Sequence, residues 1–360
     1  MELRVRNVQE AYVRGLALLR EHGVWEDTRN GRALVLPEPM ITIYERPIER
    51  VLLDPSRDAN PFFHLMEAIW MLAGRADVAS LLPFNKALAQ YSDDGLVYHG
   101  AYGHRWRQHF TIWANMDPEH MRPLDQVRRV IELLRVNPAD RRCVIQMWDA
   151  ETDLGRDGKD FPCNTQLFFR ARGQDDCPVL DMTILNRSND AVWGAYGANA
   201  VHFSVLQEFI AAACGMQTGR MIQFSNNFHA YEAVLEKVGE PVHHFQPGMQ
   251  TAYTTPTHDR VDATPLFRVD GTTDLDEVFR VIDLVWDDPH AGDITAEPLK
   301  LRVGGGGQFT PMGLVTIEAM RDAYLLRGTQ HQRMVEHLSR LNNDWGRAGV
   351  EWLERRRRKS

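Results

Sequence analysis

The segment 199–214 constrains the fold most, because it is apolar enough to form a helix that is buried on all sides. Such a helix needs layers of other elements around it. The segments 143–148, 165–171 and 179–186 are rich in β-branched and aromatic residues and are predicted to be strands. These patterns predict an α/β (α+β two-layer) fold, in which a central group of strands packs with one long buried helix and peripheral helices.

Local start and stop signals define another strong helix. Asn60-Pro61 is predicted to open it, because asparagine caps helices well and proline suits the first turn. The helix runs through Leu72 and closes at Gly74. The remaining predictions before residue 143 are a helix at 7–22, a polar loop at 26–32, a strand-like alternation across 40–53 and a helix at 125–136.

The character of the chain changes after about residue 240. A turn-rich stretch at 246–275 precedes a predicted helix near 275–287, and further helices are predicted from about 316 to 355. The glycine run at 304–307 lacks the strand-then-helix spacing of a phosphate-binding loop, so we interpret it as a flexible turn.

Charge and cysteine content exclude several classes of protein. The net charge of −8 argues against a general nucleic-acid surface, and the basic run at 355–359 is interpreted as a solvated tail. The four cysteines are scattered and form no Cys-x-x-Cys, so we expect neither a disulfide framework nor a metal site. No apolar run reaches ~18 residues and the first residues lack a signal core. We expect a cytoplasmic protein with no membrane segment and reduced thiols.

Cys163 is the candidate nucleophile because of the residues that accompany it along the chain. An isolated cysteine is more often a small buried apolar residue. A thiol that attacks a pyrimidine nucleotide must be partly ionised, which nearby arginine charge favours by lowering its pKa. The phosphate of such a substrate needs guanidinium groups in fixed geometry, and its ring and sugar need polar side chains.

Two arginine segments are candidates for the phosphate. Arg187 and Ser188 follow a predicted strand. Arg141 and Arg142 are adjacent, so on an extended segment they point to opposite faces. One active site could use both only if the loop twists or a second subunit presents them.

His229 and Tyr231 are two residues apart and share one face of an extended segment, as a clamp on the sugar requires. Each candidate alone has an ordinary structural explanation: a solvated arginine pair, a structural histidine or a half-buried tyrosine. Their occurrence together and in this order makes the structural explanation weak.

The ordered motifs resemble the thymidylate synthase superfamily over roughly residues 25–235. The resemblance implies a mixed sheet with a long buried central helix, in a catalytic domain at 1–240. The last 120 or so residues are not covered by it, and we expect 241–360 to form a helix-rich C-terminal extension packed on the same domain. The matching residues are Glu67-Ala68-Ile69-Trp70, Tyr102-Gly103-His104-Arg105-Trp106-Arg107, Asp125-Gln126-Val127, Asp140-Arg141-Arg142, Trp148, Pro162-Cys163, Asn186-Arg187-Ser188-Asn189-Asp190, Gly194, Asn199 and His229-Ala230-Tyr231.

The resemblance also implies a reaction and a homodimer. Cys163 attacks C6 of a pyrimidine nucleoside monophosphate, and C5 then takes a one-carbon unit from 5,10-methylenetetrahydrofolate. Glu67 organises water and proton transfer, and Tyr102 assists removal of the C5 proton. Asn199 reads the base edge. The other implied contacts are Arg29, Arg187, Ser188, His229 and Tyr231 to the substrate, Arg141 and Arg142 to the substrate of the partner subunit, and Asp190, Leu88, Tyr91 and Gly194 to the folate.

Several departures from the family bear on the product. The synthases seal the site with an apolar C-terminal tail, whereas this sequence ends in basic residues at 355–359. Leu88 and Tyr91 stand where the synthases carry two tryptophans, and Asn164 stands in place of a histidine. The interval from Gly194 to Asn199 is one residue longer than usual. Together the departures favour a hydroxymethylase, in which water quenches the exocyclic methylene, over reductive methylation to dTMP.

Single residues bear on which base the substrate carries and on two less favoured functions. Asn199 can present a donor and an acceptor to uracil, which favours dUMP, while dCMP stays open because the amide can flip. The resemblance implies deoxyribose as the sugar, and CMP stays open because relatives in antibiotic pathways use it. A non-catalytic RNA-binding member of the family would have no reason to keep Cys163 and Glu67 together. A cysteine hydrolase is weaker still, since no recognisable local signature supplies Cys163 with a base.

Overall fold

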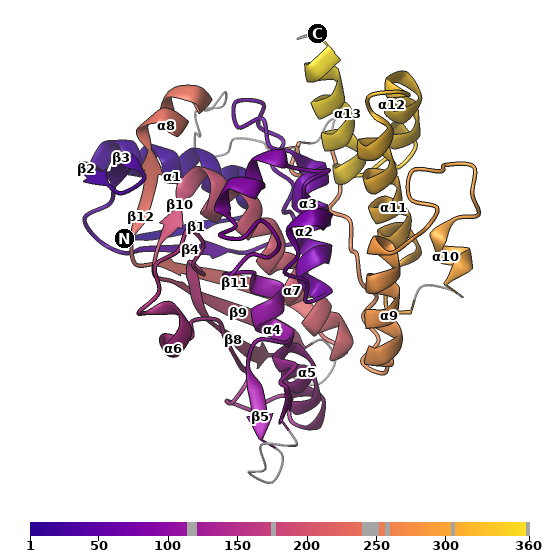
Figure 1. Ribbon diagram of the computed structural model, residues 1–360, viewed down its shortest axis with the longest axis horizontal. Helices are drawn as coiled ribbons and strands as arrows, with labels where there is room; N and C mark the ends of the chain where they lie inside the picture. The colour runs from indigo at the N-terminus through magenta and orange to yellow at the C-terminus, as the bar shows by residue number, and fades with distance from the viewer. Residues whose placement is uncertain (114–120, 174–177, 240–251, 256–259, 304–306, 358–360) are drawn as a thin grey trace.

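The computed structural model describes residues 1–113, 121–173, 178–239, 252–255, 260–303 and 307–357. A six-stranded mixed sheet in the order β1-β4-β11-β9-β8-β7 lies at its centre (Figure 1). The pairs β1–β4 and β11–β9 are parallel and the other neighbours are antiparallel. The strands are β1 (Glu2–Val5), β4 (Met40–Tyr44), β7 (Val144–Gln146), β8 (Asn164–Arg172), β9 (Val179–Asn186) and β11 (Gln217–Ser225).

The predicted central helix is confirmed as α7 (Asn199–Ala213), and every residue from 200 to 213 is buried. It packs against α2 (Pro61–Leu72). Asn60 caps α2 by accepting a hydrogen bond from Phe63 N at 3.1 Å, and Gly74 has a φ of 72°, as the sequence signals predicted. Glu67 is the one α2 residue that is not fully buried, so this apolar helix carries a single carboxylate to a partly open position.

The other helices of this part surround the sheet (Figure 1). The predicted helices at 7–22 and 125–136 are confirmed. The bounds are α1 (Val8–His22), α3 (Val78–Leu81), the 3₁₀ helix η1 (Lys86–Tyr91), α4 (Tyr102–Arg107), α5 (Gln126–Val136), α6 (Ala150–Asp153), the π-helix η4 (Ala191–Ala198) and α8 (Glu232–Val238).

The prediction of a polar loop at 26–32 is wrong. The segment forms a hairpin of β2 (Val24–Thr28) and β3 (Gly31–Val35), turned by Gly31 at a φ of 114°. All five β2 residues are exposed, so the alternation that marks a half-buried strand is missing. The hairpin belongs to a second sheet, β10-β12-β3-β2, with β10 (Asn189–Asp190) and β12 (Phe228–Tyr231). A two-stranded sheet joins β5 (Thr111–Trp113) to β6 (Met121–Pro123).

The strand pattern predicted across 40–53 is only half right. β4 ends at Tyr44, and Pro47, which has no N–H for a sheet hydrogen bond, follows shortly after. Val51 and Leu52 are buried as part of a loop instead. Their apolar side chains indicate that this segment is buried, but a buried segment need not be a strand.

The C-terminal helices stand as a group beside α2 and α7 (Figure 1). Helix α2 contacts three of them directly, α9, α11 and α13. An aromatic cluster joins the two groups: Phe62 lies 5.3 Å from Tyr324 and 5.5 Å from Trp352, measured between ring centroids. The bounds are α9 (Leu275–Trp286), α10 (Leu299–Arg302), α11 (Pro311–Leu326), α12 (His331–Ser339) and α13 (Asp344–Arg357). The expected domain boundary at 240/241 and most of the glycine run at 304–307 lie outside the described residues.

The interpretation of the basic run as a solvated tail is wrong for its first residues. Arg355 Nε donates to Asp58 Oδ1 at 3.0 Å, and Arg356 reaches both carboxylate oxygens of Asp58 at 2.9 and 3.1 Å. Asp58 has a φ of 45°, which is uncommon for a residue other than glycine. The end of α13 therefore holds the loop that precedes α2 in an unusual conformation.

A buried ion cluster joins three C-terminal helices and makes their stability sensitive to acid. Asp288 accepts hydrogen bonds from Arg302 at 2.6 and 2.9 Å and pairs with Arg321 at 2.9 Å. Burial raises the pKa of Asp288, but the two arginines and a backbone hydrogen bond outweigh it and hold the pKa well below its usual range. The carboxylate therefore stabilises the fold at neutral pH, and this contribution is lost as the pH falls below about 4, where the unfolded chain takes up the proton.

Asp288→Asn is expected to lower the free energy of unfolding at pH 7 by more than the loss of an exposed ion pair would, which is about 1 kcal/mol or less. The difference in stability between variant and wild type should narrow at pH 3, because the unfolded wild-type chain then takes up a proton on this carboxyl group while the folded chain still keeps it charged. Urea unfolding of the variant and the wild type at pH 7, 5, 4 and 3 measures the loss of stability at pH 7 and its change with pH. A gap that stays constant with pH would contradict the assigned role of the charge.

Within the described ranges, no helix combines the length and apolar character needed to cross a membrane.

Candidate active site

Cys163 lies at the start of β8, where β8 and β9 place it against the second arginine segment. Asn164 pairs with Asn186 across the two strands, so Arg187 follows directly beside Cys163. Arg187 N donates to Cys163 O at 2.9 Å, and Arg187 Nε donates to Pro162 O at 3.0 Å. The guanidinium also faces the Trp148 ring at 5.3 Å. The structure therefore brings the predicted nucleophile and a predicted phosphate ligand together.

The electrostatics of the thiol differ from the prediction. Burial raises the pKa of Cys163, and the charges of Asp160 and Asp190 add to this, while Arg187 and Arg29 lower it without prevailing. The predicted lowering by arginine is thus present but is outweighed by burial. A phosphate placed between the arginines would not make the thiol more acidic, so other groups have to assist its attack.

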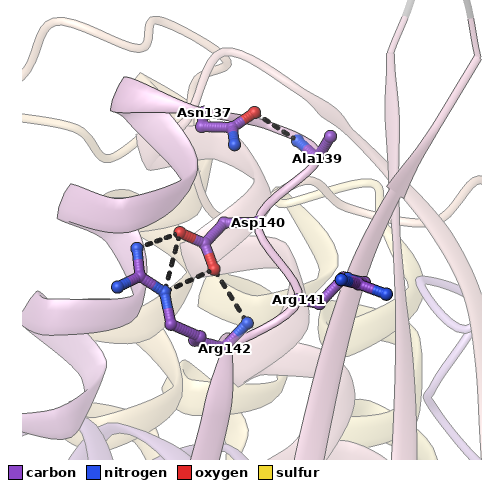
Figure 2. A pocket seen from close by; sticks show the side chains of 5 residues that line it. All are labelled: Asn137, Ala139, Asp140, Arg141 and Arg142. Carbon is purple, nitrogen blue, oxygen red and sulfur yellow. Dashed lines mark hydrogen bonds and ion pairs between the residues drawn. The ribbon is translucent and has the colours of Figure 1, made fainter.

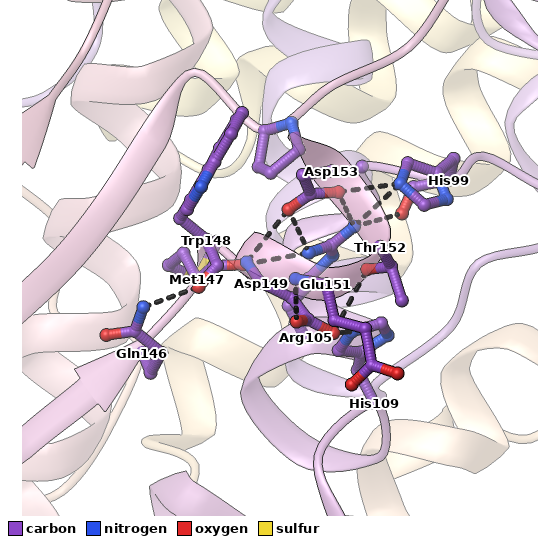
Figure 3. Close-up of polar contacts among 12 residues, drawn as sticks. His99, Arg105, His109, Gln146, Met147, Trp148, Asp149, Glu151, Thr152 and Asp153 are labelled. Carbon is purple, nitrogen blue, oxygen red and sulfur yellow. Dashed lines mark hydrogen bonds and ion pairs between the residues drawn. The ribbon is translucent and has the colours of Figure 1, made fainter. Parts of the chain in front are cut away.

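A buried ion network supports the loop before Cys163 (Figure 3). The Arg105 guanidinium is fully buried and donates to both oxygens of Asp153 at 2.7 Å and to the backbone oxygen of His99 at 3.1 Å. The next residue, Gly100, donates its N–H to Asp160 at 2.7 Å, and the His99 ring packs edge-on against Phe161. The network fixes the backbone from which the thiol projects.

Tyr102 approaches the nucleophile loop from the start of α4. Its ring stacks on Phe203 of α7, with centroids 5.8 Å apart and planes 20° apart. Burial raises the pKa of Tyr102 well above its usual value, while hydrogen bonds with the backbone of Asn164 and Cys163 act in the opposite direction. The phenol therefore keeps its proton near neutral pH and lies beside the nucleophile loop, and its predicted part in removal of the C5 proton stays a prediction.

The β2–β3 hairpin and β12 form another wall. The Arg29 guanidinium lies over the Phe161 ring at 5.9 Å. Tyr231 accepts a hydrogen bond from Asn30 Nδ2 at 3.4 Å, and its ring is 5.2 Å from that of His229. Both residues lie on β12, which confirms that they share one short extended segment.

Asp190 links this wall to the π-helix η4. It pairs with His229 in the parallel β10–β12 ladder and accepts hydrogen bonds from Val192 N at 2.8 Å and Trp193 N at 2.5 Å. Burial raises the pKa of Asp190, while the hydrogen bond from Trp193 N and the charge of His229 act against this. Ser188 lies in the short connection between Arg187 and β10 and is half-buried.

The segment between Asp190 and Asn199 is helical but irregular. Residues 191–198 form a π-helix interrupted at Gly197, whose φ of −118° and ψ of −120° are not helical, and such irregular turns often occur at functional sites. Asn199 Nδ2 lies 3.4 Å from Asn189 Oδ1. A Cβ on Gly194 would come within 2.7 Å of the same oxygen, so glycine is needed for this close approach.

Arg141 and Arg142 do not join the residues around Cys163 in the same chain. They line an open hollow of about 510 Å³ together with Asn137, Ala139 and Asp140. Figure 2 shows the two side chains pointing in different directions, with Arg142 paired to Asp140 at 2.6 Å. Phe169 N donates to Cys143 O, so the two arginines lie beside the half of β8 that is far from Cys163. At ~3.3 Å per residue, the strand from Cys163 to Phe169 alone spans about 20 Å.

The two positions that replace the family's tryptophans lie on the 3₁₀ helix η1. Leu88 packs partly against the core and Tyr91 is half-exposed. Their predicted contact with the folate stays a prediction.

His202 is a site residue that the sequence analysis missed. Its Nε2 lies 2.9 Å from Glu67 Oε2, and its side chain is 2% exposed. His202 follows Asn199 by one helical turn, so the two share a face of α7. That spacing was the available signal, but only the packing of α7 on α2 shows what the imidazole contacts.

Comparison with known proteins identifies the family. The family model described as Thymidylate synthase matches residues 20–262. Deoxyuridylate hydroxymethyltransferase of Pseudomonas phage M6 is 43% identical over 363 residues, covering 99% of this chain and 94% of that protein. The protein of the same name from Bacillus phage SP01 is 36% identical over 204 residues, covering 56% of this chain and 51% of that protein. Thymidylate synthase of Streptococcus gordonii is 34% identical over 116 residues, covering 32% and 41%.

Proposed function

The chain belongs to the thymidylate synthase family of one-carbon transferases, and we propose that it hydroxymethylates C5 of dUMP, with 5,10-methylenetetrahydrofolate as co-substrate. The observation that carries the reaction class is the position of Cys163 between Arg187 and Tyr102. The similarity to the M6 hydroxymethyltransferase supports the product. It spans 99% of this chain and therefore includes the C-terminal helices, which lie beyond the family model.

The residues around Cys163 are suited to a polar ligand. Asn164 Oδ1, Asp190 Oδ2 and His229 Nδ1 are buried and make no hydrogen bond within the described residues. Buried polar atoms of this kind are normally satisfied by a ligand or by water. The proposed substrate supplies suitable groups in its uracil and its sugar, and the folate supplies them in its pterin.

In the proposed reaction Cys163 Sγ forms a bond to C6, and the electron pair of the C5–C6 double bond becomes available at C5. The folate supplies the one-carbon unit that C5 takes. Tyr102, which lies beside the nucleophile loop, assists removal of the C5 proton, and Glu67, which contacts His202 of α7, organises proton transfer. Asn199 holds the base edge. Arg187, Ser188 and Arg29 hold the phosphate, His229 and Tyr231 the sugar, and Asp190 with Gly194, Leu88 and Tyr91 the folate.

Arg141 and Arg142 fit this scheme as residues of a partner subunit in a homodimer. Their distance from Cys163 of the same chain supports a contribution across a two-fold axis. A mixture of Cys163→Ser chains and Arg141→Ala/Arg142→Ala chains, refolded together, is expected to recover activity that neither variant has alone. No recovery, with mixed dimers formed, would contradict the proposal.

The product decides between hydroxymethylation and reductive methylation. The purified protein is incubated with 5,10-methylenetetrahydrofolate and dUMP, dCMP or CMP in separate reactions, and the nucleotides are identified by mass spectrometry. We expect 5-hydroxymethyl-dUMP with release of tetrahydrofolate. A methyl product with dihydrofolate would show a thymidylate synthase instead, and a product only with dCMP or CMP would correct the substrate.

Asn199 is expected to set the choice of base. Asn199→Asp replaces the amide donor by a carboxylate that, when protonated, can face the cytosine N3 and amino group. The ratio of kcat/KM for dCMP to that for dUMP should rise by about 10-fold or more, as one hydrogen bond to the base is worth about 1–2 kcal/mol. Asn226→Asp, at an exposed position, serves as the control. An unchanged ratio would show that Asn199 does not read the base.

A further inference from the structure

His202 occupies a position from which it can act on the chemistry through Glu67. It lies on the α7 face that carries Asn199, one turn away, and the ring of the next residue, Phe203, stacks on Tyr102. Its Nε2 is 2.9 Å from Glu67 Oε2. The imidazole therefore contacts the carboxylate proposed to organise proton transfer and shares a helix face with the residue proposed to read the base.

The hydrogen bonding of His202 is incomplete. The side chain is 2% exposed, yet neither ring nitrogen makes a well-directed hydrogen bond to any described residue. The contact with Glu67 is close, but its geometry leaves the imidazole able to serve a further partner. Buried polar groups of this kind are typically completed by an ordered water molecule with two or more polar partners.

A further polar side chain of α2 lies near the pair. His64 precedes Glu67 by one turn of α2, and the charges of Arg57 and His202 act on His64. Arg57 is itself tied to η4, donating from Nε to Val192 O at 2.8 Å. Glu67 and His64, both on α2, are thus titratable groups that lie near the imidazole.

We propose that His202 is a positioning residue that holds the Glu67 carboxylate and the attacking water for the hydroxymethyl step. The inference rests on the proposed function. The water oxygen forms a bond to the exocyclic carbon, and the electron pair of the exocyclic double bond moves into the ring toward O4. Glu67 takes the proton that the water loses. The ring electrons then restore the C5–C6 double bond as Cys163 leaves C6 as a thiolate, so the step needs no oxidant or reductant.

The test separates the steps before and after formation of the exocyclic methylene. Tritium release from [5-³H]dUMP counts every turnover that reaches the methylene, and mass spectrometry counts the hydroxymethyl product. In the wild type the two amounts should be equal. In His202→Ala we expect the ratio of hydroxymethyl product to tritium released to fall by about 10-fold or more, the low end of what proton-transfer groups contribute. Added 2-mercaptoethanol should then capture the methylene as a thioether.

Two further variants keep the result interpretable. His202→Gln places an amide nitrogen near the position of Nε2 and is expected to recover much of the ratio. His337→Asn, on α12, controls for loss of a partly buried histidine and should leave the ratio at the wild-type value. If tritium release and product fall together in His202→Ala and His202→Gln, the inference is wrong and His202 acts earlier or only in folding. Absence of a hydroxymethyl product from the wild type would instead overturn the proposed function.

Discussion

Replacing Cys163 by serine is expected to reduce product formation by about 10⁴-fold or more, because in the proposed reaction the first bond to C6 is made by the sulfur. An alcohol is far less ionised and less nucleophilic than a thiol near neutral pH. Nucleotide binding should be retained, since the contacts of Arg187 with this loop go to the backbone oxygens of Pro162 and Cys163 and survive the change. Mass spectrometry of the product and equilibrium dialysis of dUMP measure the two effects.

Cys214→Ser is the matched control for this experiment. Cys214 closes α7 and its Sγ contacts Ile131 O at 3.8 Å, away from the nucleophile loop. Its loss should leave turnover unchanged. Substantial turnover by Cys163→Ser would exclude thioether chemistry for this protein.

Glu208→Gln is expected to lower the free energy of unfolding by about 3–5 kcal/mol, the usual effect of breaking a buried ion pair. Glu208 pairs with Arg50, and the two side chains are 4% and 0% exposed. The same carboxylate accepts hydrogen bonds from Leu266 N at 2.7 Å and Phe267 N at 3.1 Å. The change leaves the buried arginine without its counter-charge and weakens the tie between α7 and the C-terminal segment.

Urea unfolding followed by tryptophan fluorescence measures this loss. Glu236→Gln makes the same chemical change at an exposed position of α8 and should shift the midpoint little. Equal midpoints for the two variants would show that the Arg50–Glu208 pair does not hold the C-terminal segment to the core.

The sequence predicted those parts of the fold whose causes are local. Asn60, Pro61 and Gly74 fix the ends of α2 through capping and backbone geometry, and the apolar run of α7 reports its burial directly. The β2–β3 hairpin was missed because an exposed strand carries no apolar alternation. An element could be predicted where residues close in sequence determine its conformation, and it was missed where they do not.

The candidate site was predictable as a set of residues but not as an electrostatic environment. The order of motifs identified Cys163 and Arg187, and the strand pairing brings them together. The raised pKa of Cys163 depends on burial by elements distant in sequence, which no local pattern contains. The contact of His202 with Glu67 likewise requires α2 and α7 to pack, so it could only be found in the folded chain.

The hold of Arg355 and Arg356 on Asp58 has a consequence for the order in which the molecule is made. The partners are separated by 297 and 298 residues, so the loop before α2 is synthesised long before its anchors exist. Arg57 in that loop reaches η4, beside the predicted folate side of the site. A ribosome-bound chain that already contains every predicted catalytic residue would therefore still lack this anchor. We expect it to become active only after α13 has emerged and docked.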